Sequence, residues 1–339
     1  CYYITIYPKY INHALDILSD IYFNSLVLDK NLKKEKPVVL NELTKNKSKP
    51  SRVIQQEMIS TLMKDTSMKN PVIGTEANVK SFKRDDLMSF LNFYYNPHKV
   101  LLSIGGYTDK QSVLLNNIKK RFGIKKTYPS IKKITGKRDL YPRFYELKTH
   151  SKIKYIKKDI DTSYVTIGFP TYKLHSKNSY VLDIIATILA GYMSSRLYKR
   201  LRNDLGIIYN INNNIDSLED CGYYYLMCGT HDVEKCVPVI FEELNNLKIT
   251  DVSAEELKRA KDHINGSNKM SMNDSGTLAT HYGIHYLYYG KIVTMEETID
   301  NLNKVTASDI KRVANLTFQH SKMKLCYMGK KKCDLKNTL

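Results

Sequence analysis

The feature that most constrains the fold is an internal repeat. Residues 82–106 align without a gap on residues 305–329, with a constant offset of 223 positions, as from Asp86 to Asp309. A period this long is typical of two duplicated domains, since solenoid repeats have periods of about 20–50 residues. The sequence therefore predicts two related halves.

The first copy of the repeat is expected to be incomplete. When the alignment is extended toward the N-terminus, the segment that starts at Cys1 aligns near Cys221. The second copy has residues 151–220 before Cys221, and the first copy has no matching residues before Cys1. We therefore predict an incomplete domain at 1–125, a basic linker at 126–150 and a complete domain at 151–339. The opening strand, helix and hairpin of the first copy are expected to be absent.

Hydrophobic periodicity predicts the same α+β pattern in both halves. Ala14, Leu15 and Leu18 recur at helical steps, and Pro50 is placed to open a helix with one apolar face. The predicted fold is two duplicated domains, each a mostly antiparallel sheet with helices packed on one face. Strands are expected at 1–7, 99–104, 152–158, 162–169, 207–215 and 221–229. A helix followed by one more strand is expected within 306–328.

Charge alone points to nucleic acid, because the net charge is +19. The basic residues are spread along the chain, however, and the densest run, within 125–143, is interrupted by Pro129, Gly136 and Pro142. This composition favours a solvated linker. No aromatic RNA-recognition motif is present, so nucleic acid is not the expected partner. The excess of positive charge is compatible with acidic peptides, and equally with a Lys-rich genome.

Cysteine usage and hydropathy bear on the compartment. The six cysteines form no C-x-x-C pair, which favours reduced thiols and an intracellular protein over a disulfide scaffold. No apolar run approaches the ~18 residues that a membrane span needs, so none is predicted. The localisation is otherwise unknown.

Two pairs of side chains have spacings that would place both members on one face of a helix. Glu35 and Glu42 are seven residues apart and would lie within about 20° of one helix face. Taken alone, such glutamates are typical of a solvated surface. His281 and His285 have metal-competent i, i+4 spacing, but Tyr282 stands where the motif H-E-x-x-H has its glutamate. We therefore do not expect a ligand role for these histidines.

Several segments resemble one protein family. Residues 15–21 and 34–42 are similar to the segment that carries the third zinc ligand of the insulinase, pitrilysin and mitochondrial-processing-peptidase family, the inverted zincins. Residues 74–76 and 94–97 match the part that follows, and residues 191–209 resemble the hallmark of its second domain. The resemblance covers nearly the whole chain.

The resemblance implies a zinc metallopeptidase with two histidine ligands and a general base in H-x-x-E-H. By residue match, Glu42 would be the third zinc ligand. Glu35 would be the catalytic carboxylate that lies behind the ligands and orients them. Arg202 and Tyr209 would bind substrate, and the alternative for Tyr209 is a structural role in a buried strand. H-x-x-E-H occurs nowhere in the sequence; the family places it roughly 75 residues before the third ligand, upstream of Cys1. This chain alone is therefore predicted to be inactive and not to hold zinc.

Two functions follow from the resemblance. The first is a zinc-dependent metalloendopeptidase that cleaves peptide or protein substrates in a chamber between two domains. The second is a non-catalytic homologue that binds peptides or a catalytic partner subunit. A homodimer or heterodimer is left open in either case.

Overall fold

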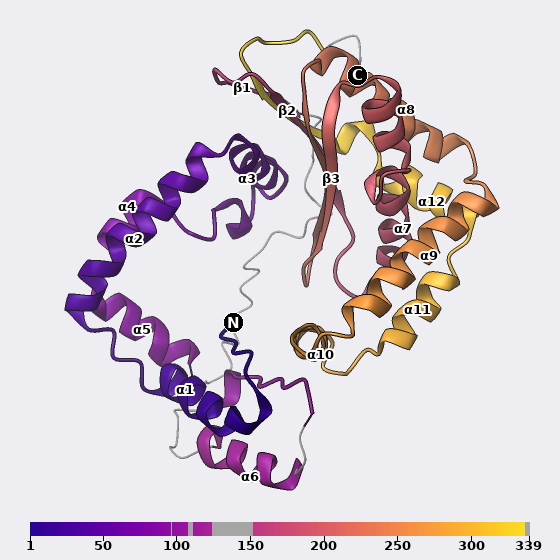
Figure 1. The fold of residues 1–339 in the computed structure, drawn as a ribbon. Coiled ribbons are helices and arrows are strands. Elements are labelled where there is room, and N and C mark those ends of the chain that lie inside the picture. The colour runs from indigo at the N-terminus through magenta and orange to yellow at the C-terminus, as the bar shows by residue number, and fades with distance from the viewer. Residues whose placement is uncertain (96, 108–110, 124–151, 336–339) are drawn as a thin grey trace. The chain divides into compact units, whose positions relative to one another are not determined.

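A computed structural model describes residues 1–95, 97–107, 111–123 and 152–335 (Figure 1). The predicted linker at 126–150 lies outside the described residues. The described chain forms two compact units. The first holds residues 1–43, 73–123 with the gaps just given, and 270–293; the second holds residues 44–72, 152–269 and 294–335.

The second unit is built on a mixed five-stranded sheet with the order β1-β5-β2-β4-β3. β1 and β5 pair in parallel, and the other neighbours pair antiparallel. The α+β class and the mostly antiparallel pairing are therefore confirmed in this unit. The strands are β1 (Lys152–Lys157), β2 (Ser163–Thr171), β3 (Ile208–Ser217), β4 (Gly222–Thr230) and β5 (Lys324–Gly329).

One face of the sheet is covered by helices from the second half of the chain (Figure 1). The main core packs side chains of β2, β4 and β5, such as Phe169, Tyr224 and Leu325, against these helices. Their burial is the main source of stability for this unit. The helices are α7 (Asn178–Ala190), α8 (Val233–Ile249), α9 (Ala254–Ser271), α11 (Met295–Asn303) and α12 (Ala307–Thr317).

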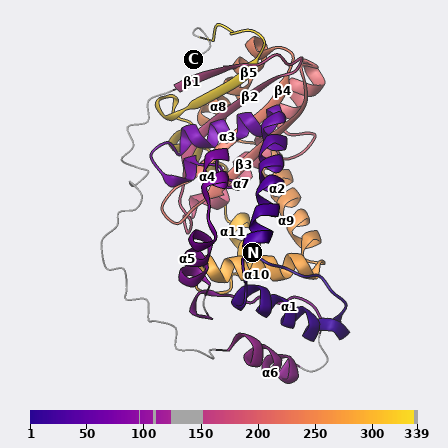
Figure 2. The same ribbon diagram turned by 90° about the vertical axis from the view of Figure 1, so that its left-hand side faces the viewer.

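The opposite face of the sheet is covered by α3 (Pro50–Leu62). Ile54 and Met58 of this helix are fully buried against β4 and β5. The prediction that helices pack on one face only is therefore wrong for this sheet. The reason is visible in β4, where Tyr223 faces α3 while Tyr224 faces the main core, so both sides of the strand are apolar. Figure 2 shows α3 in front of the sheet.

Gly168 of β2 allows α3 to approach the sheet closely. A Cβ atom at this position would lie 2.6 Å from Met58 Sδ and 2.9 Å from Leu62 Cδ1. Both distances are shorter than a carbon or sulfur contact allows, so a larger residue would displace these two side chains or the helix that carries them.

Helices are the only regular secondary structure in the described residues of the first unit, and the strands predicted at 1–7 and 99–104 are wrong. A strand is stable only when its backbone groups pair with a neighbour, and within this unit's described residues neither segment joins a sheet. The second segment lies against α10 instead, where Ser103 Oγ donates to the Ala279 carbonyl at 2.6 Å. The helices are α1 (Ile11–Phe23), α2 (Asp29–Ser48, whose last turn belongs to the other unit), α4 (Glu76–Ser81), α5 (Arg84–Tyr94), α6 (Gln111–Phe122) and α10 (Ser275–Tyr289).

The internal repeat is reproduced at the ends of its helices. Both bounds of α12 lie 223 positions after the matching bounds of α5, and the short helix η6 (His320–Lys322) follows η3 (Pro97–Lys99) by the same offset. Asp86 accepts the Lys83 N–H at 2.8 Å, and Asp309 accepts the Thr306 N–H at 3.1 Å. The two copies therefore share their helix starts as well as their helix lengths.

Candidate functional site

The clearest surface pair in the second unit joins Arg202 to Tyr209. The Arg202 guanidinium carbon lies 4.9 Å from the centroid of the Tyr209 ring, and Arg202 Nη1 donates to the Ile208 carbonyl at 3.1 Å. The Tyr209 side chain is 77% exposed. The pair thus presents a fixed cation and an open aromatic ring to solvent.

The local backbone explains why these two side chains meet. Arg202 lies in the π-helical segment η5 (Tyr198–Asp204), and Gly206, at φ +64°, reverses the chain into β3. The pairing of β3 with β4 is irregular between Ile208 and Ile211. Tyr209 lies within this irregularity, which is typical of strand positions that direct a side chain toward a site.

A network of ion pairs centred on the buried Glu243 anchors η5 and the residues before it. Arg196 forms a bidentate pair with Glu256 of α9 at 2.6 and 2.7 Å. Arg200 Nη1 donates to Glu243 of α8 at 2.7 Å and its Nη2 donates to Glu242 at 2.8 Å. The hydrogen bonds that the two arginines donate to these carboxylates raise the pKa of both guanidinium groups. Sequence reasoning missed the network, because its acidic members are 42–60 positions away from the arginines.

Glu35 and Glu42 both lie on α2 and are exposed, as the helical spacing predicts. Across the part of the chain that the structure describes, there is no group of three or more His, Cys, Asp or Glu side chains that could hold a metal ion. Zinc sites in proteins need at least three such donors. The described residues therefore do not fit a zinc site, and no second ligand accompanies Glu42.

The histidine pair on α10 is brought together. The ring centroids of His281 and His285 are 4.0 Å apart. A pocket of about 710 Å³ between α1 and α6 is lined by Asp16, Asp20 and Arg121 among others and contains none of the predicted site residues. None of the helices described is long and apolar enough to cross a membrane.

Curated relatives match along most of the chain. A Bacillus subtilis protein named "uncharacterized zinc protease YmxG" is 28% identical over 320 residues, which are 94% of this chain and 75% of that protein. A Rickettsia felis protein named "uncharacterized zinc protease" is 26% identical over 322 residues, 94% of this chain and 74% of its own length.

Solved structures share the fold at lower identity. A protease from Helicobacter pylori superposes with a TM-score of 0.83 at 17% identity, covering 95% of this chain and 77% of the other. A chain of Complex III2 from Candida albicans gives a TM-score of 0.79 at 16% identity, covering 98% and 80%. At these identities the likeness concerns the fold alone.

Two family models match consecutive parts of the chain. The model of the insulinase family, peptidase family M16, matches residues 1–76. The model of the peptidase M16 inactive domain matches residues 81–264, which is more than half of the 339 residues. Together with the resemblance in residues 34–42 and 191–209, these matches show that the chain belongs to the M16, or insulinase, family of peptidases.

Proposed function

We propose that this protein is a zinc-dependent metalloendopeptidase of the insulinase type, which cleaves peptides in a chamber between two domains, and that its second unit binds the peptide. The observation that carries the proposal is the Arg202–Tyr209 pair. Its place in residues 191–209, within the matched inactive-domain model, supports a role in substrate binding.

The chemistry of the pair suits a peptide backbone. The Ile208 carbonyl and the Tyr209 ring hold the guanidinium in place, so little side-chain entropy is lost when it binds a ligand. Among the described residues, Arg202 Nε and Nη2 have no hydrogen-bond acceptor. These donors and the Tyr209 hydroxyl can bind a peptide carbonyl or carboxylate.

We propose that α2 supplies only part of the zinc site. Glu42 would supply one zinc ligand, and Glu35 would orient the ligands around it. The two histidines and the general base must come from an H-x-x-E-H motif, which these 339 residues do not contain. The names of the relatives as zinc proteases support this assignment.

A second candidate is a non-catalytic homologue that binds peptides or a partner subunit. One observation favours it: residues 81–264 match the model of the peptidase M16 inactive domain. Both candidate functions assign peptide binding to the Arg202–Tyr209 pair. They differ in whether the protein binds zinc and cleaves the bound peptide.

The experiment that separates the candidates combines this chain with an M16 domain that carries H-x-x-E-H. For the peptidase, Glu42→Gln is expected to remove zinc and cleavage together, whereas Glu35→Gln weakens metal affinity by about 10–100-fold. Arg202→Gln is expected to raise KM with zinc retained, the sign of lost substrate binding. Peptide binding without zinc or cleavage would favour the non-catalytic homologue.

A further inference from the structure

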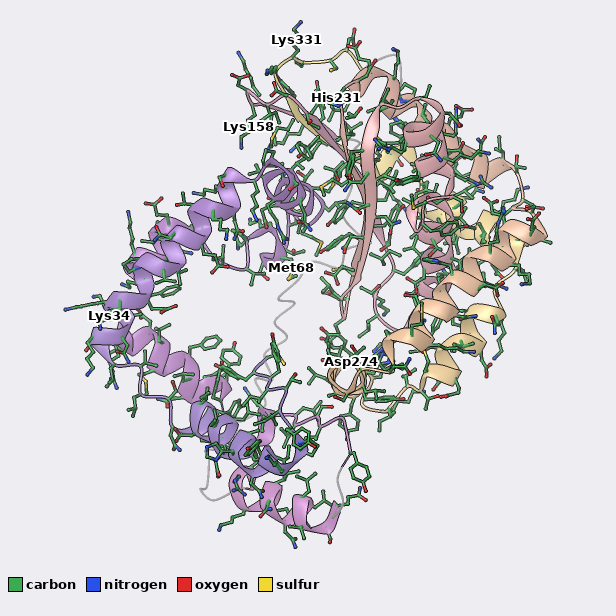
Figure 3. All side chains as sticks on the ribbon, viewed as in Figure 1. Lys34, Met68, Lys158, His231, Asp274 and Lys331 are labelled. Carbon is green, nitrogen blue, oxygen red and sulfur yellow. The ribbon has the colours of Figure 1, made fainter. Side chains whose placement is uncertain are left out.

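The histidine pair lies on a well-defined helix of the first unit. α10 begins at Asp274, whose carboxylate accepts the Thr277 N–H at 2.7 Å, and it ends at Gly290, which adopts φ +65° (Figure 3 labels Asp274). His281 and His285 are one turn apart in its middle, and their ring planes are inclined by 34°. The helix therefore holds both imidazoles on one face.

Each ring has a buried nitrogen atom without a partner. Among the described residues, neither His281 Nε2 nor His285 Nδ1 has a hydrogen-bond partner. Burying such an atom costs free energy, which a ligand at the site would recover. Burial also lowers the pKa of both histidines, and the charge of His281 lowers the pKa of His285 further. Both rings are thus neutral near pH 7, the state in which imidazole binds metal.

Neighbouring groups restrict how the rings can turn. A hydrogen bond with the Val293 backbone partly offsets the lowering of the His281 pKa by burial, and Nε2 has no partner among the described residues. A hydrogen bond to the other ring nitrogen is the usual support of a metal-binding histidine. The Tyr282 ring centroid lies 5.2 Å from the His281 ring centroid, and the Tyr289 ring centroid lies 5.5 Å from that of His285.

We propose that His281 and His285 form a binding site for a divalent transition-metal ion, with water completing the coordination. The site is separate from Glu42 and from the Arg202–Tyr209 pair. Two imidazoles suit Ni²⁺ and Cu²⁺ and do not suit Mg²⁺ or Ca²⁺, which prefer oxygen ligands. Because the pair supplies only two protein ligands, it is a binding site of moderate affinity and not a closed catalytic centre.

The test measures Ni²⁺ binding by calorimetry on the full chain with Cys1→Ser, which removes the exposed thiol as a competing ligand. We expect one Ni²⁺ per chain, and an affinity at least about 10-fold lower in His281→Gln or His285→Gln, because the chelate is lost. His231→Gln, a change at the exposed histidine labelled in Figure 3, is the matched control and should leave the affinity unchanged. Glu42→Gln should also leave it unchanged, which separates this site from the proposed zinc ligand.

A second measurement needs no substitution at the pair. Ni²⁺ should protect His281 and His285 from modification by diethyl pyrocarbonate, as mapped by mass spectrometry, and should leave His231 reactive. Equal Ni²⁺ affinity in the parent and both pair variants would overturn the proposal. So would modification of the pair at the same rate with and without Ni²⁺.

Discussion

At the scale of single residues, the charge network behind Arg202 rests on Glu243. This side chain is 6% exposed and contacts both Arg196 and Arg200. Its neighbour Glu242 bonds the same Arg200 but is 58% exposed. A buried carboxylate with two partners contributes far more to stability than an exposed one with a single partner.

Glu243→Gln is therefore expected to lower the free energy of unfolding by about 2–3 kcal/mol, because the charge-assisted hydrogen bond from Arg200 and the ion pair with Arg196 are both weakened. The matched control is Glu242→Gln, for which a change within about 0.5 kcal/mol is expected. Urea denaturation measures both. Equal losses in the two variants would mean that burial does not set the importance of Glu243.

The histidine pair predicts a pH dependence of stability. The pKa of both histidines is lowered in the folded chain by burial and rises to its ordinary value on unfolding. The unfolded chain then binds more protons than the folded chain between the lowered pKa and about 6.5, so the free energy of unfolding falls as the pH falls through this window. Denaturation at about pH 7.5 and about pH 5.5 should show a larger loss in the parent than in the double variant His281→Gln, His285→Gln. An identical loss of unfolding free energy in the parent and in the double variant would contradict a role of the histidine pair in this pH dependence.

Sequence reasoning at this scale succeeded where partners are close in the chain. The four-residue spacing of His281 and His285 identified a real pair, although the expected outcome was no ligand role. Arg202 and Tyr209 are seven positions apart, and the structure places them in contact. The network around Glu243 was out of reach, because α8 and α9 meet η5 only after the chain has folded.

At the scale of elements, the repeat predicted helices better than strands. The offset of 223 positions reproduces both ends of α5 and α12, since a helix depends on its own caps and apolar face. Residues 101–106 match β5 in sequence and still form no strand, because β5 depends on β1 and β2 as neighbours. Local signals fix helices, whereas strands need partners elsewhere in the chain.

The placement of α3 on the sheet makes a prediction about Gly168. Gly168→Ala is expected to cost about 1–3 kcal/mol, because the new methyl group overlaps Met58 and Leu62. Gly266→Ala is the matched control: nothing lies within 4 Å of its Cβ position in α9, and a gain of up to about 1 kcal/mol is expected. Thermal unfolding of the two variants is the measurement. A neutral Gly168→Ala would indicate that α3 does not pack closely on β2.

At the scale of the whole molecule, the two copies differ in the residues assigned to function. Glu42 aligns with Asn265, so the second copy lacks the proposed zinc ligand. The Arg202–Tyr209 pair belongs to the 151–220 stretch, which the predicted alignment gives to the second copy alone. This asymmetry supports a division in which one copy contributes to the metal site and the other binds peptide.

The most direct test of that division is the affinity of the chain itself for short, unstructured, fluorescently labelled peptides, measured by anisotropy. We expect saturable binding that weakens by about 10-fold in Arg202→Gln, because a charge-assisted hydrogen bond is lost. Tyr209→Ala should weaken binding similarly, since the ring that holds the guanidinium is removed. Arg259→Gln, at an exposed arginine of α9, should bind as the parent does. Equal affinity in all four proteins would contradict a peptide site at Arg202 and Tyr209.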